Sequence, residues 1–232
     1  MSIPVHDLVV YGATSAGIAA AVQGVRMGKS VIVIEPGQRI GGMTTCGLGD
    51  TDAGTEEAVG GVAREFYLRV GRKYGREEAV WMFEPSVALA VMEDLVRENR
   101  IRILFGERLD RSHGVEKSGT TVVSLTMESG LLVAGRMFLD AGYEGDLLAA
   151  AGVASIIGRE ANAQHGESQN GIRSENELPD GIDPYRTPGD PASGLLARVN
   201  PHPGGHEGDG DRKLQAYNFR MCLTDDPANC LP

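Results

Sequence analysis

The segment GATSAG, residues 12–17, has the residue types and spacing of a phosphate-binding turn. A tight turn between a strand and a helix points backbone N–H groups at a phosphate, and the helix dipole favours the negative charge there. Dinucleotide-binding turns carry a further glycine between the outer two, where the pyrophosphate approaches the backbone; here Thr14 stands in that region. Its hydroxyl can donate to a phosphate oxygen. The alternative is an ordinary strand–helix connection that holds two glycines.

Glu35 is the second candidate for chemistry, because it ends the apolar stretch SVIVIE that follows this turn along the chain. A carboxylate at that position accepts hydrogen bonds from an adenosine ribose and favours a free 2′-hydroxyl over a 2′-phosphate. The alternative is a solvated charge at the end of a strand. Together with the turn, the ribose role is favoured.

A βαβ unit must position these residues. Asp7–Tyr11 is a short apolar run that ends at a glycine, which is typical of a buried parallel strand. Ser15–Met27 is rich in alanine with apolar residues at helical spacing, and Gly28 is a helix stop. Ser30–Glu35 predicts a second buried strand. Strand, turn, helix and strand in about 30 residues form the βαβ unit.

The rest of the chain predicts further elements and a division into two domains. The predicted helices are Val62–Tyr74, Pro85–Asn99 and Leu147–Ala151, the predicted strands are Ile101–Phe105, Arg136–Ala141 and Lys213–Leu223, and a small antiparallel β-meander is expected between Arg108 and Val133. From residue 158 the composition shifts to Gly, Pro, Asp, Asn and His. We therefore expect one domain over residues 1–157 and a second, loop-dominated one over 158–232.

Composition excludes some classes of function. A net charge of −10 argues against nucleic acid as the main partner. No stretch reaches the roughly 18 apolar residues of a membrane span, and no signal peptide is recognisable, so we expect no membrane and a cytoplasmic location. The three cysteines Cys46, Cys222 and Cys230 are too dispersed for an iron–sulfur cluster or a disulfide framework, and we expect no metal.

Four segments resemble the N-terminal part of a family of FAD-dependent oxidoreductases. They are GATSAG, the segment RIGGM over residues 39–43, the segment FLDAGYEGDLLAAAGV, and GREANAQHGESQNGI together with LQAYNFRMCLTDDPANCLP. The subgroup is xanthan-lyase-like, related to the flavin domain of heterodisulfide reductase, and commonly has threonine where other turns have the middle glycine. The resemblance implies an α/β fold: a Rossmann-type FAD-binding domain, glutathione-reductase-like, with an inserted antiparallel β-meander and a truncated second domain.

The resemblance also implies which residues bind FAD. The pyrophosphate would lie on Gly12, Thr14, Ser15, Ala16 and Gly17, and the adenosine ribose on Glu35. Arg39, Gly41, Gly42 and Met43 would follow the ADP half, Thr44, Thr45 and Gly47 would lie toward the isoalloxazine, and Asp140, Ala141 and Gly142 would close over the cofactor. The implied activity is hydride or electron transfer through a non-covalent flavin, on an unknown small-molecule substrate and with an electron-transfer partner.

Length is the main departure from the family, whose members are roughly twice as long. We therefore expect a fragment, and the rival hypothesis is a truncated, non-catalytic module that binds adenine nucleotides. An NAD-dependent enzyme is a second rival, against which the segment RIGGMTT argues because it suits the elongated ADP path of FAD.

Several other residues remain open as candidates. Cys46 is a weak candidate for a catalytic thiol, and a small packing residue is the favoured alternative. His202 and His206 have the alternatives of touching a metal or lying in a solvated loop, and the loop is favoured. Arg159 and Glu160 are equally compatible with pairing and with holding substrate.

Overall fold

The computed structural model describes residues 3–173, 181–201, 204–214 and 222–229. The chain divides into two compact units. The first comprises the described residues within Met1–Ala154 and Phe219–Pro232, and the second those within Ser155–Asn218. The predicted strand Lys213–Leu223 lies for the most part outside the described residues.

One six-stranded sheet forms the centre of the first unit, in the order β3-β2-β1-β6-β5-β4. Its strands are β1 (Val5–Tyr11), β2 (Val31–Glu35), β3 (Arg102–Phe105), β4 (Val115–Ser118), β5 (Thr121–Thr126) and β6 (Leu132–Asp140). β1 pairs in parallel with both β2 and β6, and β2 pairs in parallel with β3. The strands β4 and β5 are antiparallel. Since β1 is central, the loop that follows it lies where two further parallel strands also end.

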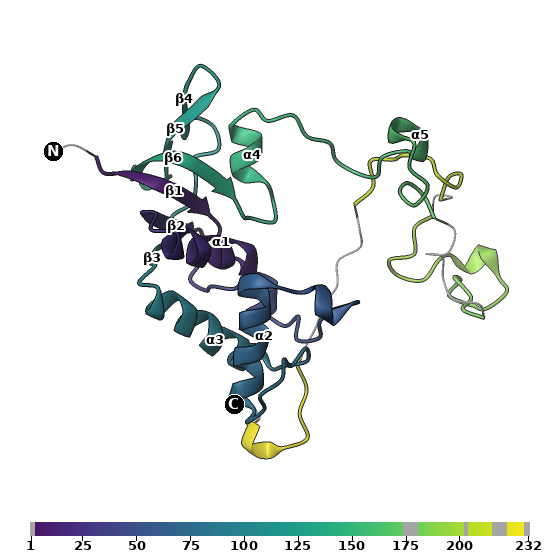
Figure 1. Cartoon of the computed structure of the whole chain (residues 1–232). Helices are drawn as coiled ribbons and strands as arrows, with labels where there is room; N and C mark the ends of the chain where they lie inside the picture. Colours follow the sequence, from purple (N-terminus) through teal and green to yellow (C-terminus); the bar gives the residue numbers. More distant parts are fainter. Residues whose placement is uncertain (1–2, 174–180, 202–203, 215–221, 230–232) are drawn as a thin grey trace. The chain divides into compact units, whose positions relative to one another are not determined.

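Helices cover both faces of this sheet (Figure 1). The helices of the first unit are α1 (Ser15–Arg26), α2 (Gly61–Lys73), α3 (Pro85–Glu98) and α4 (Asp146–Ala150), with the short 3₁₀ turns η1 (Gly42–Thr45), η2 (Glu56–Ala58) and η5 (Pro227–Asn229). Successive side chains of β1 point to opposite faces of the sheet and so belong to two separate cores. Val10 packs among residues of α1, α2 and α3, whereas Val9 and Tyr11 belong to the core that contains Leu147 of α4. The predicted α/β class is confirmed, and the sheet is consistent with a Rossmann-type domain.

The predicted helices and strands of this unit are confirmed to within a few residues, with one exception. The division into a meander ending at Val133 and a separate strand Arg136–Ala141 is wrong. A single strand, β6, pairs antiparallel with β5 near Val133 and in parallel with β1 along its length. Gly135 does not interrupt it, because a Cβ atom there would lie 2.5 Å from Cγ2 of Val9, and glycine allows this close approach.

Loops dominate the second unit, which contains α5 (Asn162–His165) and the 3₁₀ turn η4 (Pro191–Ser193). Arg159 and Asp211 hold two of its segments together: their backbones form a bridge, and the two side chains form an ion pair with 2.5 Å between Nη2 and Oδ2. Arg159 therefore pairs with Asp211, whereas Glu160 lies 3.7 Å from Nε2 of His165.

An ion-pair network joins the three helices on one face of the sheet. Glu65 of α2 accepts hydrogen bonds from Arg26 of α1, at 2.6 Å, and from Arg69, at 2.7 Å; Arg69 also reaches Glu98 of α3 at 2.7 Å. These two guanidinium groups hold the pKa of the Glu65 carboxyl at about 2. Because the folded state lowers this pKa, the stabilisation is complete above the unfolded value of 4.5 and is lost as the pH falls toward 2.

We expect Glu65→Gln to lower the free energy of unfolding by about 1–2 kcal/mol at pH 7, a reduced value because both partners keep some solvent contact. The difference from the wild type should shrink between pH 4.5 and 2. Urea titrations at several pH values measure it, with Glu93→Gln as a control because Glu93 is an exposed glutamate of α3. A constant difference across this pH range would contradict the prediction.

Candidate functional site

Three loops meet at the carboxyl-terminal edge of the central parallel strands. They are the turn after β1, the segment 36–46 after β2, and the segment 141–145 after β6. Gly41 N donates to Ala13 O at 2.7 Å, and Ala141 N donates to Tyr11 O at 2.8 Å. The predicted site residues from all three segments are therefore brought together in one place, which is where α/β proteins bind their ligands.

Thr14 connects the first loop to the third. Its hydroxyl donates to Ala141 O at 2.7 Å and accepts from Gly17 N at 3.3 Å, so that Thr14 is the N-cap of α1. A hydroxyl has a single proton to donate. The expected donation from Thr14 to a phosphate is therefore replaced by an internal bond, and the residue is buried, with 7% of its surface exposed.

Thr14→Val should remove the cap and the bond to Ala141 without changing the side-chain volume much. We expect a loss of about 1–3 kcal/mol in the free energy of unfolding, because Ala141 O and Gly17 N would then be buried without that partner. Thr14→Ser keeps the hydroxyl and should stay within about 1 kcal/mol of the wild type. Equal unfolding midpoints for the valine and serine variants would contradict this assignment.

The two glycines of the turn are required by close backbone approach. A Cβ atom at Gly17 would lie 2.0 Å from Gly12 O, and one at Gly12 would lie 2.8 Å from Gly142 N. Gly12 also has φ +100, which side-chain-bearing residues rarely adopt. The turn therefore leaves the first turn of α1 open, with Ala16 exposed. First-turn N–H groups have no partner within a helix and can bind an anion.

Glu35 lies beside this turn at the end of β2. Its carboxylate accepts hydrogen bonds from Ala13 N through Oε2 and from Gly37 N through Oε1, each at 2.7 Å. The sequence predicts that Glu35 accepts hydrogen bonds from a ribose, but it does not indicate that Glu35 also binds the backbone of the turn at Ala13 N. Each carboxylate oxygen keeps a further acceptor site. The arrangement fits the ribose and diphosphate of a dinucleotide, because it combines a carboxylate with the N-terminus of α1 and a turn that contains two closely packed glycines.

The segment after β2 is braced internally. Arg39 donates through Nε and Nη2 to Thr45 O, at 3.1 and 2.7 Å, and the buried Thr45 hydroxyl donates to Ile40 O. Gly41 has φ +87, and a Cβ there would lie 2.2 Å from Thr45 Cγ2. Arg39 and Thr45 thus fix the path of the loop that carries Gly42 and Met43 past the turn.

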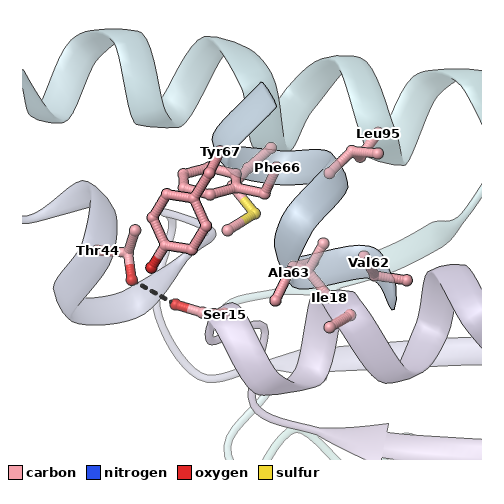
Figure 2. Close-up of a pocket in the computed structure, with 10 residues that line it drawn as sticks. Ser15, Ile18, Thr44, Val62, Ala63, Phe66, Tyr67 and Leu95 are labelled. Carbon is pink, nitrogen blue, oxygen red and sulfur yellow. Dashed lines mark hydrogen bonds between the residues drawn. The ribbon is translucent and has the colours of Figure 1, made fainter. Parts of the chain in front are cut away.

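Ser15 and Thr44 join the α1 N-terminus to η1 through their hydroxyls, which are 2.6 Å apart (Figure 2). Ser15 also donates to Gly41 O at 3.0 Å. The pair adjoins a pocket of about 100 Å³ whose other walls are apolar; Ile18, Ala19, Val62, Ala63, Phe66, Tyr67, Met92 and Leu95 line it. The site therefore has an apolar hollow next to the first turn of α1.

Asp140, Ala141 and Gly142 lie at the end of β6, as the sequence indicates, and all three have hydrogen-bond partners within the protein. Asp140 accepts hydrogen bonds from Gly142 N and Leu148 N, at 3.0 and 2.9 Å, so one of its oxygens braces the loop after β6 and the other binds the first turn of α4. The carbonyl oxygen of Ala141 accepts the hydrogen bond from the Thr14 hydroxyl. Beneath them, burial raises the pKa of Tyr11, whose hydroxyl accepts from Leu109 N.

Sequence reasoning misses Tyr143, which crosses from the third loop to the second. Its hydroxyl accepts a hydrogen bond from Met43 N at 2.8 Å. A Cβ atom at Gly42 would lie 2.1 Å from this hydroxyl, so only glycine leaves room for it. The sequence shows a tyrosine directly after the residues DAG, but no local pattern indicates that its partner is Met43, 100 residues earlier.

Among the described residues, the remaining candidates form no hydrogen bond to the turn. Cys46 is an exposed free thiol, 3.9 Å from Thr45 Oγ1, at the end of η1, and Gly47 follows it with φ +127. His202 lies outside the described residues, and His206 is exposed. Within the described part of the chain, no three His, Cys, Asp or Glu side chains are grouped as metal ligands. The helices described there are also too short or too polar to cross a bilayer.

Comparison with one solved structure supports the fold, and two further structures are similar at lower scores. L-proline dehydrogenase from P. horikoshii superposes with a TM-score of 0.51 at 15% identity, over 69% of this chain and 59% of that protein. L-amino acid deaminase from Proteus vulgaris, with a specific insertion deleted, gives 0.49 at 16% identity over 68% and 58%, and a flavin-dependent brominase gives 0.49 at 18% over 68% and 42%. The chain thus spans under two thirds of the length of these proteins. No curated protein matched the sequence.

A family model identifies the chain directly. The model for FAD dependent oxidoreductases matches residues 7–232, which include all three loops of the site and the second unit. The cofactor of this family is FAD, in agreement with the ribose and diphosphate that the turn fits. The chain belongs to the family of FAD dependent oxidoreductases.

Proposed function

We propose that this chain binds the ADP half of FAD at the three converging loops and acts as a flavin-dependent oxidoreductase on a small molecule. The observation that carries the proposal is the bond from Ala13 N to Glu35 Oε2 at 2.7 Å. Through this bond the Glu35 carboxylate, which we propose as the acceptor for the ribose, lies directly against the turn whose helix N-terminus suits a diphosphate.

In this proposal the chain's residues bind and orient the cofactor. Backbone groups of Gly12 through Gly17 hold the pyrophosphate, and Glu35 accepts from the ribose hydroxyls. Arg39, Gly41, Gly42 and Met43 follow the ADP half, Thr44, Thr45 and Gly47 lie toward the isoalloxazine, and Asp140, Ala141 and Gly142 close the third side. FAD itself supplies the hydride or electron transfer when bound.

A hollow of about 530 Å³ next to the second loop supports a position for the adenine. Gln38, Arg39 and Phe105 are among the residues that line it. Phe105 is the parallel partner of Glu35 in the sheet and is 43% exposed, so an apolar ring lies one strand away from the ribose acceptor. A planar base gains stabilisation by contact with such a ring.

The finer relationships belong to the same proposal. The segments GATSAG, RIGGM and FLDAGYEGDLLAAAGV support the xanthan-lyase-like subgroup, and the composition of residues 158–232 supports the beginning of a substrate domain that follows an FAD-binding domain over 1–157. The cysteine content supports a cytoplasmic location. We also propose a small-molecule substrate and an electron-transfer partner, because a flavin that is reduced by one must be reoxidised by the other.

The test is the visible absorbance spectrum of the purified chain, with release of bound cofactor on denaturation and titration with ADP. Flavin bands at one FAD per chain are the expected result. A colourless, folded chain that binds ADP would favour the rival hypothesis, a non-catalytic adenine-nucleotide-binding module. A folded chain that binds neither would overturn the assignment of Glu35 and the turn.

A further inference from the structure

We propose that Tyr143 is an additional cofactor contact, whose hydroxyl donates a hydrogen bond to the diphosphate. This inference rests on the proposed function and adds a residue that neither the sequence motifs nor the family match single out. It starts from the position of the side chain between two loops of the site.

Both ends of Tyr143 lie on the proposed cofactor path. The backbone of Tyr143 lies beside the turn, because the preceding residue, Gly142, packs closely against Gly12. A Cβ atom at Gly12 would lie only 2.8 Å from Gly142 N. At the other end of Tyr143, the hydroxyl lies 2.8 Å from Met43 N and against Gly42. The side chain therefore runs from the phosphate-binding turn to the second loop.

The hydroxyl of Tyr143 retains a proton to donate. A phenol has one O–H donor and two acceptor lone pairs, and the Met43 N–H uses a lone pair. Across the described residues, the structure gives this O–H no acceptor. The side chain is 54% exposed, and Met43 beside it is 53% exposed, so a ligand can reach the proton.

The bond from Met43 makes this donor a directed one. It fixes the oxygen at the end of a side chain that rotates about two bonds, and polarises the O–H in the direction of donation. A diphosphate oxygen is a charged acceptor, and hydrogen bonds to charged groups are the stronger kind. Thr14, whose proton is used at Ala141 O, cannot make this contact.

Phenylalanine at position 143 tests the donor without removing the ring. We expect Tyr143→Phe to weaken ADP binding about three- to tenfold in calorimetric titration of the full chain. Adenosine, which has the ribose and base but no phosphate, should bind the variant and the wild type equally, as measured by competition with ADP.

Tyr74→Phe is the matched control. The Tyr74 hydroxyl also accepts a backbone N–H, from Glu84 at 3.0 Å, and this side chain is 38% exposed at the end of α2. Removal of the Tyr74 hydroxyl should lower the free energy of unfolding about as much as Tyr143→Phe does, and it should leave the affinity for ADP unchanged. Thermal melts of both variants show whether either change has disturbed the fold.

The outcomes separate this inference from the proposed function. A loss confined to ADP and to Tyr143→Phe supports the diphosphate contact. Equal ADP affinity in wild type and variant, or an equal loss for ADP and adenosine, overturns it while leaving the proposed function in place. A wild-type chain that binds neither ADP nor FAD overturns the proposed function and this inference with it.

Discussion

Gly17→Ala is expected to weaken nucleotide binding strongly and to destabilise the first unit by about 3 kcal/mol or more, the upper range for overpacking a well-packed core. The new Cβ atom would lie 2.0 Å from Gly12 O, a backbone atom that no rotamer change can move away. Relief requires α1 to shift relative to β1. Such a shift displaces Thr14 from Ala141 and opens the N-terminus of the helix.

The measurement pairs urea unfolding with ADP titration at a temperature where the variant is folded. We expect ADP affinity to fall about a hundredfold or more, because a displaced helix N-terminus loses hydrogen bonds to the charged diphosphate that are worth about 1.5–3 kcal/mol each. Gly60→Ala is the control, since a Cβ there meets nothing within 4 Å and the residue has φ −129. A Gly17→Ala variant that unfolds and binds like the wild type would show that the turn is looser than this packing implies.

The main outline of the site could be predicted from the sequence because it depends on local patterns. The buried ends of β1 and β2 are apolar runs, and glycines mark where β1 ends and where α1 stops. Carboxyl ends of parallel strands share one edge of a sheet. That topology is sufficient to bring the turn, Glu35 and Asp140 together.

Contacts between distant segments could not be predicted in the same way. The Thr14 proton goes to Ala141, 127 residues away, and Tyr143 reaches Met43, 100 residues away. A hydroxyl with several possible partners is assigned only when the register of β1 and β6 is known. The same reason explains the error in β6, because only the pairing with β1 shows that residues on both sides of Gly135 belong to one strand.

Replacing Glu35 by glutamine is expected to have the second large effect, on both affinity and specificity. Glutamine keeps the length and one acceptor oxygen but removes the charge and one of the two bonds, to Ala13 N and Gly37 N. Bonds to a charged group are worth about 1.5–3 kcal/mol each, so ADP affinity should fall about ten- to a hundredfold.

Specificity gives the sharper readout, because it separates the ribose role from the bracing of the turn. A carboxylate beside the ribose repels a 2′-phosphate, so the wild type should bind ADP well and adenosine 2′,5′-bisphosphate poorly. Glu35→Gln removes the repulsion and should bring the two affinities closer. If the bracing of Ala13 were the whole role, the variant would lose affinity for both ligands in the same proportion.

Glu128→Gln is the control for the Glu35 variant, because it changes an exposed glutamate between β5 and β6 and should leave both affinities unchanged. The Glu35→Gln variant should also lose about 1–2 kcal/mol in the free energy of unfolding, because the N–H of either Ala13 or Gly37 is left without its acceptor. If the variant loses stability but the ratio of the affinities for ADP and adenosine 2′,5′-bisphosphate does not change, Glu35 only positions the turn. If that ratio changes, Glu35 is the group that selects the ribose.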